Sequence, residues 1–89
     1  MLLMTIYTYE PDKRDEVLRR RAEGIFKPEG ASLVGQWSSV TGGRVFTIFE
    51  LEKPLTAVKW SQAWNDLGKF EVYPVVDTEE MIKAMAAAK

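Results

Sequence analysis

The side chain best suited to chemistry in this sequence is Glu50. It follows Phe46 and Ile48 at two-residue spacing, so all three point to one face if the segment is a strand. A carboxylate among apolar neighbours loses hydration, which suits it to act as a general base or to hold a polar ligand group. The alternatives are an ion pair with Arg44 on the same face and a solvated strand end. Glu50 is therefore the candidate catalytic residue, with these alternatives open.

Other strand side chains could line the same site. Trp37 has small residues on both sides, which leaves room for a pocket wall or for packing between subunits. Gln36 lies in the opposite strand phase, so it shares a face with Trp37 only if a bulge interrupts the strand. Tyr7 offers a hydroxyl, although a strand tyrosine usually just packs. The predicted ligand-binding residues are Tyr7, Trp37, Arg44, Phe46 and Glu50.

The residue types that are missing narrow the possible chemistry. The 89 residues include no cysteine and no histidine. This removes thiol nucleophiles, disulfides, imidazole metal ligands and the commonest general base. We therefore expect neither a metal nor a cofactor. The net charge of −1 argues against a general polyanion binder.

Length and hydropathy favour one small cytoplasmic domain. Met1–Ile6 is apolar but too short for a signal sequence, and no run approaches the length of a membrane span. A domain of this size without disulfides or metals commonly gains stability by oligomerising.

The strands that must position these side chains are predicted from alternation and turn residues. Leu33–Val40 and Arg44–Leu51 flank Gly42-Gly43, and a Gly-Gly pair supplies the positive φ values of a tight hairpin. Both faces of the second strand are apolar, so both should be covered. We expect a further strand at Leu2–Tyr9, with Leu2, Met4 and Ile6 packed under the helices. The alternate positions, which carry tyrosines and threonine, should line a half-enclosed, more hydrated surface. Phe70–Val76 is a fourth strand, and its Pro74 suggests a sheet edge or a strand end.

Three helices are predicted between and after the strands. The first opens at Pro11 and Asp12, the second runs from Pro54 to about Asp66 before Gly68, and the third runs to about Ala88. Asp77 or Thr78 caps the third, which has little apolar bulk and is expected to dock on something else. The apolar positions of the first two helices are Val17, Leu18, Ala22 and Ile25, then Ala57, Trp60, Ala63, Trp64 and Leu67. Lys27–Gly30 is expected to be a loop.

The resulting order, β-α-β-β-α-β plus a C-terminal helix, is the ferredoxin-like α+β arrangement. We expect residues 1–76 to form this domain and residues 77–89 to form a helical tail. Two helices cover one face of a four-stranded antiparallel sheet and leave the other face open. The simplest cover for that apolar face is a second copy of the chain, giving a two-fold dimeric barrel with a small interior.

One string of residues resembles a known family: Trp60-x-x-x-Trp64-x-Asp66-Leu67-x-x-Phe70-Glu71-Val72-x-Pro74-Val75. It resembles the uncharacterised family called domain of unknown function 3303, in the dimeric α/β-barrel superfamily. The resemblance continues upstream through Arg44-x-Phe46-x-x-x-Glu50 and Trp37, and covers about residues 1–76. It implies the fold and the dimer, and no catalytic residue, because the family has no established activity. Tyr7 departs from it, since many relatives would carry an acidic residue there.

Three functions are compatible with these features. The leading one is a homodimer that binds a small, mostly apolar molecule in the cavity between the sheets. Superfamily relatives include cofactor-independent oxygenases, so catalysis is open. The second is a non-catalytic interaction or regulatory module, for which Met81, Ile82 and Met85 offer a narrow apolar edge.

The third function, RNA binding, is disfavoured. Arg44–Phe49 is loosely similar to the third-strand signature of RNA-recognition motifs. However, Val45 replaces its glycine, Ile48 replaces an aromatic residue, and the sequence pI is about 5.4. We therefore expect no nucleic-acid partner.

Overall fold

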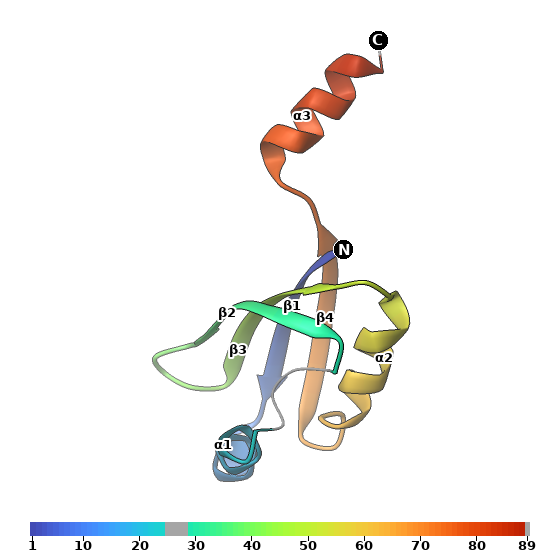
Figure 1. Ribbon diagram of the computed structural model, residues 1–89. Helices are drawn as coiled ribbons and strands as arrows, with labels where there is room; N and C mark the ends of the chain where they lie inside the picture. The colour runs from blue at the N-terminus through green and yellow to red at the C-terminus, as the bar shows by residue number, and fades with distance from the viewer. Residues whose placement is uncertain (25–28, 89) are drawn as a thin grey trace.

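The computed structural model describes residues 1–24 and 29–88. A short 3-10 helix, Pro11–Lys13, leads into the first α-helix. The strands and helices are, in chain order, β1 (Leu2–Tyr9), α1 (Arg14–Ala22), β2 (Ala31–Ser38), β3 (Arg44–Leu51), α2 (Pro54–Gln62), β4 (Gly68–Val75) and α3 (Thr78–Ala87) (Figure 1). This confirms the predicted order of elements.

The four strands form one antiparallel sheet in the order β2-β3-β1-β4. The hairpin β2–β3 thus lies beside β1, and β4 returns to the other side of β1. Pro74 sits in the edge strand β4, where its missing N–H costs no ladder bond on the outer side. The ferredoxin-like fold predicted from the sequence is confirmed.

The prediction of which β1 face packs under the helices is wrong. The buried side chains are those of the other phase: Leu3, Thr5, Tyr7 and Tyr9. They form one core with Val17 of α1 and Trp60 of α2. Tyrosines suit this layer because their rings pack edge-on against indoles and the Tyr7 hydroxyl finds a backbone acceptor. Leu2, Met4 and Ile6 lie half-buried on the open face instead.

The β2–β3 hairpin turns at Gly42 and Gly43, with φ values of 82° and 88°, as predicted. Its first strand runs two residues earlier than predicted, and Val40 is fully exposed beyond it. The pairing register shifts between Leu33 and Gly35, which is a β-bulge. This bulge decides which side chains of β2 reach each face of the sheet.

The two covering helices are shorter than predicted. Val17 of α1 is buried, but Leu18 is 47% exposed, and Ile25 lies outside the described residues. Residues 27 and 28 of the predicted loop also lie outside them. Helix α2 ends at Gln62 and continues as turns, so Gly68 begins β4 rather than ending the helix. Trp60 and Trp64 are both buried in the core, as predicted.

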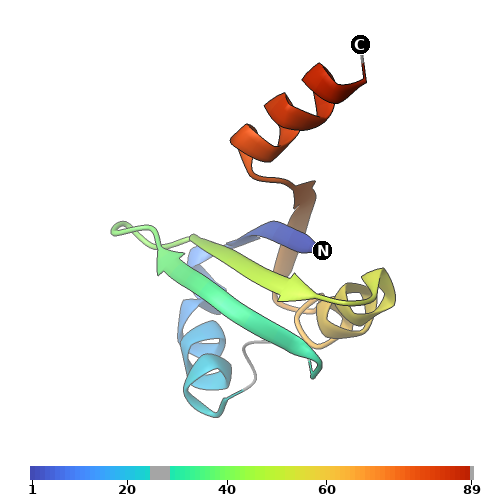
Figure 2. The same ribbon diagram turned by 45° about the horizontal axis from the view of Figure 1, so that its top comes forward.

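Helix α3 projects away from the sheet beyond the end of β4 (Figures 1 and 2). The Asp77 side chain caps it by accepting from the backbone N–H groups of Glu79 and Glu80, as predicted. None of its residues is buried. The radius of gyration is accordingly 15.0 Å, against about 12 Å for a compact chain of this length. Within the described part of the chain, no helix is both long and apolar enough to span a membrane.

Candidate functional site

A small cavity lies between the sheet and the helices α1 and α2. Its volume is about 50 Å³, enough for about three water molecules or for one small chemical group. Three of its lining residues, Leu18, Arg21 and Ser38, are exposed, so a longer molecule can extend outward past them. The lining residues are Tyr7, Val17, Leu18, Arg21, Gln36, Ser38, Val45, Thr47, Trp60, Trp64 and Phe70.

Tyr7 forms one wall of this cavity. Its hydroxyl donates to the carbonyl oxygen of Trp64 at 2.7 Å, and its ring packs edge-on against the Trp64 indole with centroids 5.6 Å apart. Burial, and secondarily the negative charge of Asp66, raises the pKa of Tyr7 to about 12. The hydroxyl is therefore neutral at physiological pH and holds the turn after α2 against β1.

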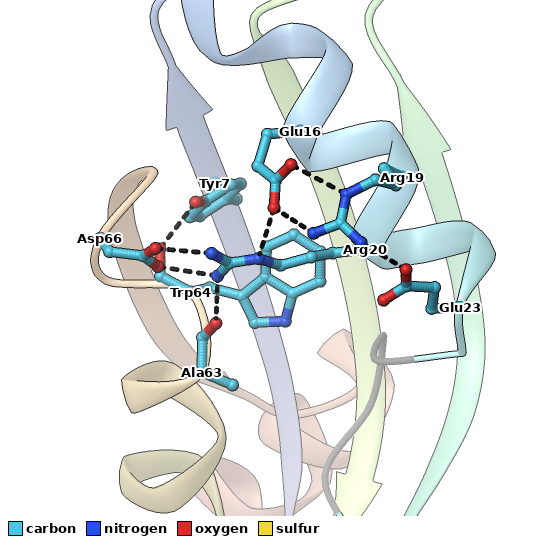
Figure 3. Close-up of polar contacts among 8 residues, drawn as sticks. All are labelled: Tyr7, Glu16, Arg19, Arg20, Glu23, Ala63, Trp64 and Asp66. Atoms are coloured by element: carbon cyan, nitrogen blue, oxygen red, sulfur yellow. Dashed lines mark hydrogen bonds and ion pairs between the residues drawn. The ribbon is translucent and has the colours of Figure 1, made fainter.

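The outer side of Trp64 is covered by Arg20 (Figure 3). Both terminal nitrogens of the guanidinium donate to the Asp66 carboxylate, at 2.8 and 2.6 Å, and one also donates to the Ala63 carbonyl oxygen at 2.8 Å. The guanidinium carbon lies 6.0 Å from the Trp64 ring centroid. Arg20 holds the pKa of Asp66 below its ordinary value. This cluster ties α1 to the turn that presents Trp64.

The three consecutive arginines of α1 do not form one patch, because successive residues of a helix project about 100° apart. Arg19 pairs with Glu16 and Glu23 on the helix surface (Figure 3). Its hydrogen bond holds the pKa of the Glu16 carboxyl below its ordinary value. Arg20 points to Asp66, and Arg21 points across to β2. Each arginine therefore serves a different contact.

A polar chain crosses the sheet side of the cavity. The Arg21 Nε donates to the Gln36 Oε1 at 2.7 Å, and the Gln36 Nε2 donates to the Thr47 hydroxyl at 3.0 Å. Gln36 reaches this face because the bulge at Val34 sets it opposite Thr47. The bulge thus supplies the cavity with an amide group and sends Trp37 to the other face.

Both core tryptophans line the cavity, and each carries one indole N–H group. The indole nitrogens of Trp60 and Trp64 are buried, and neither has a hydrogen-bond acceptor among the described residues. The aromatic rings around them are closely packed: the centroid of the Trp60 ring lies 5.0 Å from that of Phe49 and 4.8 Å from that of Phe70. Two N–H donors thus lie unpaired in the packed core among the described residues.

Four of the five predicted ligand-binding residues lie on the open sheet face, away from this cavity. Trp37 pairs in register with Phe46, while Arg44 and Glu50 stand at opposite ends of β3. The fifth residue, Tyr7, faces the helices, so the prediction that it lies on the open face with the others is wrong. The structure thus separates Tyr7 from the other four. A ligand role for those four stays a prediction.

Glu50 is more exposed than predicted in the single chain. Its side chain is 53% exposed and pairs with the N-terminal ammonium group of Met1 at 2.5 Å. The considered ion pair with Arg44 is not found among the described residues, and six residues of strand place the two about 20 Å apart. The desolvation that a catalytic carboxylate needs would have to come from a second protein copy.

Trp37 lies flat over its own strand. A Cβ atom at Gly35 would come within 2.3 Å of the Trp37 ring, so the glycine makes room for the indole. The ring is still 56% exposed. Together with the half-buried Ile6, Phe46 and Ile48, it forms an apolar surface across the sheet.

The sequence alone did not indicate the cavity on the helix side. Trp60 and Trp64 were placed on the apolar side of a helix, Thr47 was given no role, and Gln36 was considered only as a possible partner of Trp37. The signal that could have found them is chemical: two tryptophans on one short helical segment carry two N–H donors that a core must satisfy. Among the described residues, no group of acidic side chains could hold a metal ion.

The order of the elements and the strand order β2-β3-β1-β4 define a ferredoxin-like α+β protein. The chain belongs to the family described as Domain of unknown function (DUF3303), whose profile matches residues 1–89, including the tail that the sequence resemblance left out. No curated protein matches it.

Two solved structures share the fold. One is Rv0793 from Mycobacterium tuberculosis, with 14% identity, a TM-score of 0.52, and coverage of 85% of this chain and 94% of the other. The second is a Deinococcus radiodurans protein proposed to be an antibiotic biosynthesis monooxygenase, with 9% identity, a TM-score of 0.51, and coverage of 86% and 94%. At these identities the likeness concerns the fold alone.

Proposed function

We propose that the protein is a homodimer in which each protomer binds a small, mostly apolar molecule in the cavity between the sheet and the helices. The observation that carries the proposal is the composition of the cavity wall. Aliphatic and aromatic side chains such as Val17, Val45 and Phe70 surround a few buried polar groups, as is typical of small-molecule sites. The site predicted from the sequence, between two sheets, stays a prediction, because the structure comprises one chain.

The size of the cavity limits the ligand. A closed apolar cavity of about 150 Å³ holds a benzene ring, whereas this one has about 50 Å³. It therefore takes the head of a molecule whose remainder leaves between the exposed residues Leu18 and Ser38, or it widens there. Both residues lie on the solvent side of the cavity.

The dimer is supported by the open sheet face. Four strands of eight residues cover roughly 26 by 19 Å, or about 500 Å² in each protomer, so two facing sheets bury about 1,000 Å². That is near the lower end for a specific interface. Trp37, Phe46 and Glu50 would then lie between the protomers. Helix α3 buries none of its residues within its own chain, so it is available to extend the contact.

Native mass spectrometry of freshly purified protein tests the binding proposal. We expect the intact chain to retain a small molecule. Val45→Phe, which fills the cavity from β3, should abolish the retention. Val72→Phe is the matched control, because Val72 is 44% exposed and does not line the cavity. Equal retention by the two variants would contradict the proposed site, and so would a failure of the unmodified chain to bind any small apolar compound.

One observation favours the second candidate, an interaction or regulatory module. Met81, Ile82 and Met85 of α3 are 50%, 59% and 63% exposed and lie on a helix that buries nothing within its own chain. Removing residues 78–89 tests it. A smaller assembly, or loss of a bound protein, would support the module; an unchanged assembly would contradict it.

A further inference from the structure

A second cleft lies at one end of the sheet. It is formed by the C-terminal end of β1, the start of the helical segment that follows, and the turn between β2 and β3. Its volume is about 540 Å³, which is within the range of small-molecule sites. It shares no lining residue with the cavity between the sheet and the helices, so it is a separate candidate for binding.

Two arginines line this cleft, Arg14 from α1 and Arg44 from β3. The chain has five arginines, and the other three, Arg19, Arg20 and Arg21, bond to side chains of the protein itself. Arg14 and Arg44 are exposed and form no ion pair or side-chain hydrogen bond with any described residue. The two arginines whose charges the protein leaves unpaired thus lie at one cleft, although they are far apart in the sequence.

The rest of the lining is mostly polar. Thr8, Ser39 and Thr41 add side chains with hydroxyl groups, and the hydroxyls of Ser39 and Thr41 lie 3.2 Å apart. Gly42 and Gly43 also line the cleft and have no side chain that would narrow it. An apolar molecule would gain little from such a wall, whereas a group that accepts hydrogen bonds finds both charged and neutral donors.

The number of donors favours a phosphate group over a carboxylate. A guanidinium group presents its N–H donors as a planar fork that matches two oxygens of either anion. The fork of one arginine therefore occupies both oxygens of a carboxylate, whereas a phosphate group has a third oxygen for the second arginine or for a hydroxyl. A phosphate group also carries about 1.5 to 2 negative charges at neutral pH, so the two arginines attract it more strongly than a single charge.

We propose that this cleft binds a phosphate group between Arg14 and Arg44, with the hydroxyl groups of Ser39 and Thr41 as further donors. The inference goes beyond the proposed function, because it concerns another site and does not need the apolar cavity to be occupied. Arg44 was predicted from the sequence to bind a ligand beside Glu50. In this proposal it has a ligand role at the opposite end of β3.

The test is a titration of the intact ¹⁵N-labelled protein at constant pH and ionic strength, followed by NMR. The probes are phenyl phosphate, inorganic phosphate and benzoate, and the backbone amides of Gly42 and Gly43 report on the cleft. Arg14→Gln and Arg44→Gln each remove one positive charge from the lining. Lys69→Gln is the matched control, because this exposed residue of β4 carries the same charge and does not line the cleft.

We expect both phosphates to shift the Gly42 and Gly43 signals in a saturable way, and each arginine variant to bind them about five-fold more weakly. Lys69→Gln should change the affinity by less than about two-fold, because solvent screens a charge outside the cleft. Glu10→Gln should strengthen binding, since it removes the negative charge of a lining residue. Tighter binding of phenyl phosphate than of inorganic phosphate would support a phosphorylated molecule as the ligand, and the reverse would support the free ion.

Three results would overturn the inference. The first is that neither phosphate gives a saturable shift, and the second is that benzoate binds as tightly as phenyl phosphate. The third is that Lys69→Gln weakens binding as much as the arginine variants, because the anion would then respond only to the overall charge of the protein. Each of these results leaves the proposed function standing, since the retention of an apolar molecule in the other cavity is measured separately.

Discussion

Replacing Tyr7 by phenylalanine should change the pH dependence of stability as well as its size. At neutral pH the variant leaves the buried Trp64 carbonyl oxygen without the 2.7 Å hydrogen bond, which costs about 1–2 kcal/mol of unfolding free energy. In the folded protein, burial raises the pKa of Tyr7 from 10.0 to about 12. Folding therefore favours the protonated phenol, and its stabilisation is complete below pH 10 and is lost as the pH rises towards 12.

The loss follows from linkage. The difference between the two pKa values corresponds to about 2.7 kcal/mol at full ionisation, and about 1.4 kcal/mol of it is lost by pH 11. Phenylalanine does not ionise, so the stability gap between the two proteins should shrink to near zero at pH 11. Urea unfolding of both proteins from pH 7 to pH 11 measures the gap. Tyr73→Phe, which removes an exposed hydroxyl bonded to Glu71, is the control and should have a smaller effect. A gap between the unmodified protein and the Tyr7 variant that is independent of pH would refute the reasoning.

Three further predictions concern single contacts. Gly68→Ala should destabilise the protein by about 1–3 kcal/mol in urea unfolding, because its Cβ would lie 2.4 Å from the Thr8 carbonyl oxygen; an unchanged midpoint would contradict this. Asp66→Asn should lower the melting temperature at pH 7 but not in strong acid. Arg20 holds the pKa of Asp66 below its ordinary 3.8, so the pair is lost as the carboxyl protonates. The same difference in melting temperature between variant and unmodified protein at both pH values would argue against this. Asp77→Ala should weaken α3 by about 1 kcal/mol in amide exchange while the sheet is unaffected, since the helix does not pack on it; faster exchange in the sheet would show that α3 docks there.

The fold was predictable because its signals are local. The Gly42-Gly43 turn, Pro54 at the start of α2 and Asp77 at the start of α3 each act through the backbone of their own neighbours. Alternation then sets the strands. These features need no knowledge of distant residues, which is why the order of elements was correct.

The candidate site was harder to predict because it depends on contacts between distant segments. Both phases of β1 are apolar enough to be buried, and the choice between them depends on the fit of Tyr7 to Trp64, 57 residues away. The faces of Gln36 and Trp37 depend on a bulge at Val34, which leaves no mark in the sequence alternation. Predicting the cavity would have required both facts together.

The apolar open face of the sheet is the feature on which the proposed dimer depends. Its centre is formed by Met4, Ile6, Phe46 and Ile48, which are only half-buried in the described chain. Ile48→Lys puts a charge at this centre without touching the helix-side core. Sedimentation equilibrium at micromolar concentration measures the outcome. We predict twice the 10.1 kDa chain mass for the unmodified protein and a folded species of 10.1 kDa for the variant. A mass of 10.1 kDa for the unmodified protein would contradict the account.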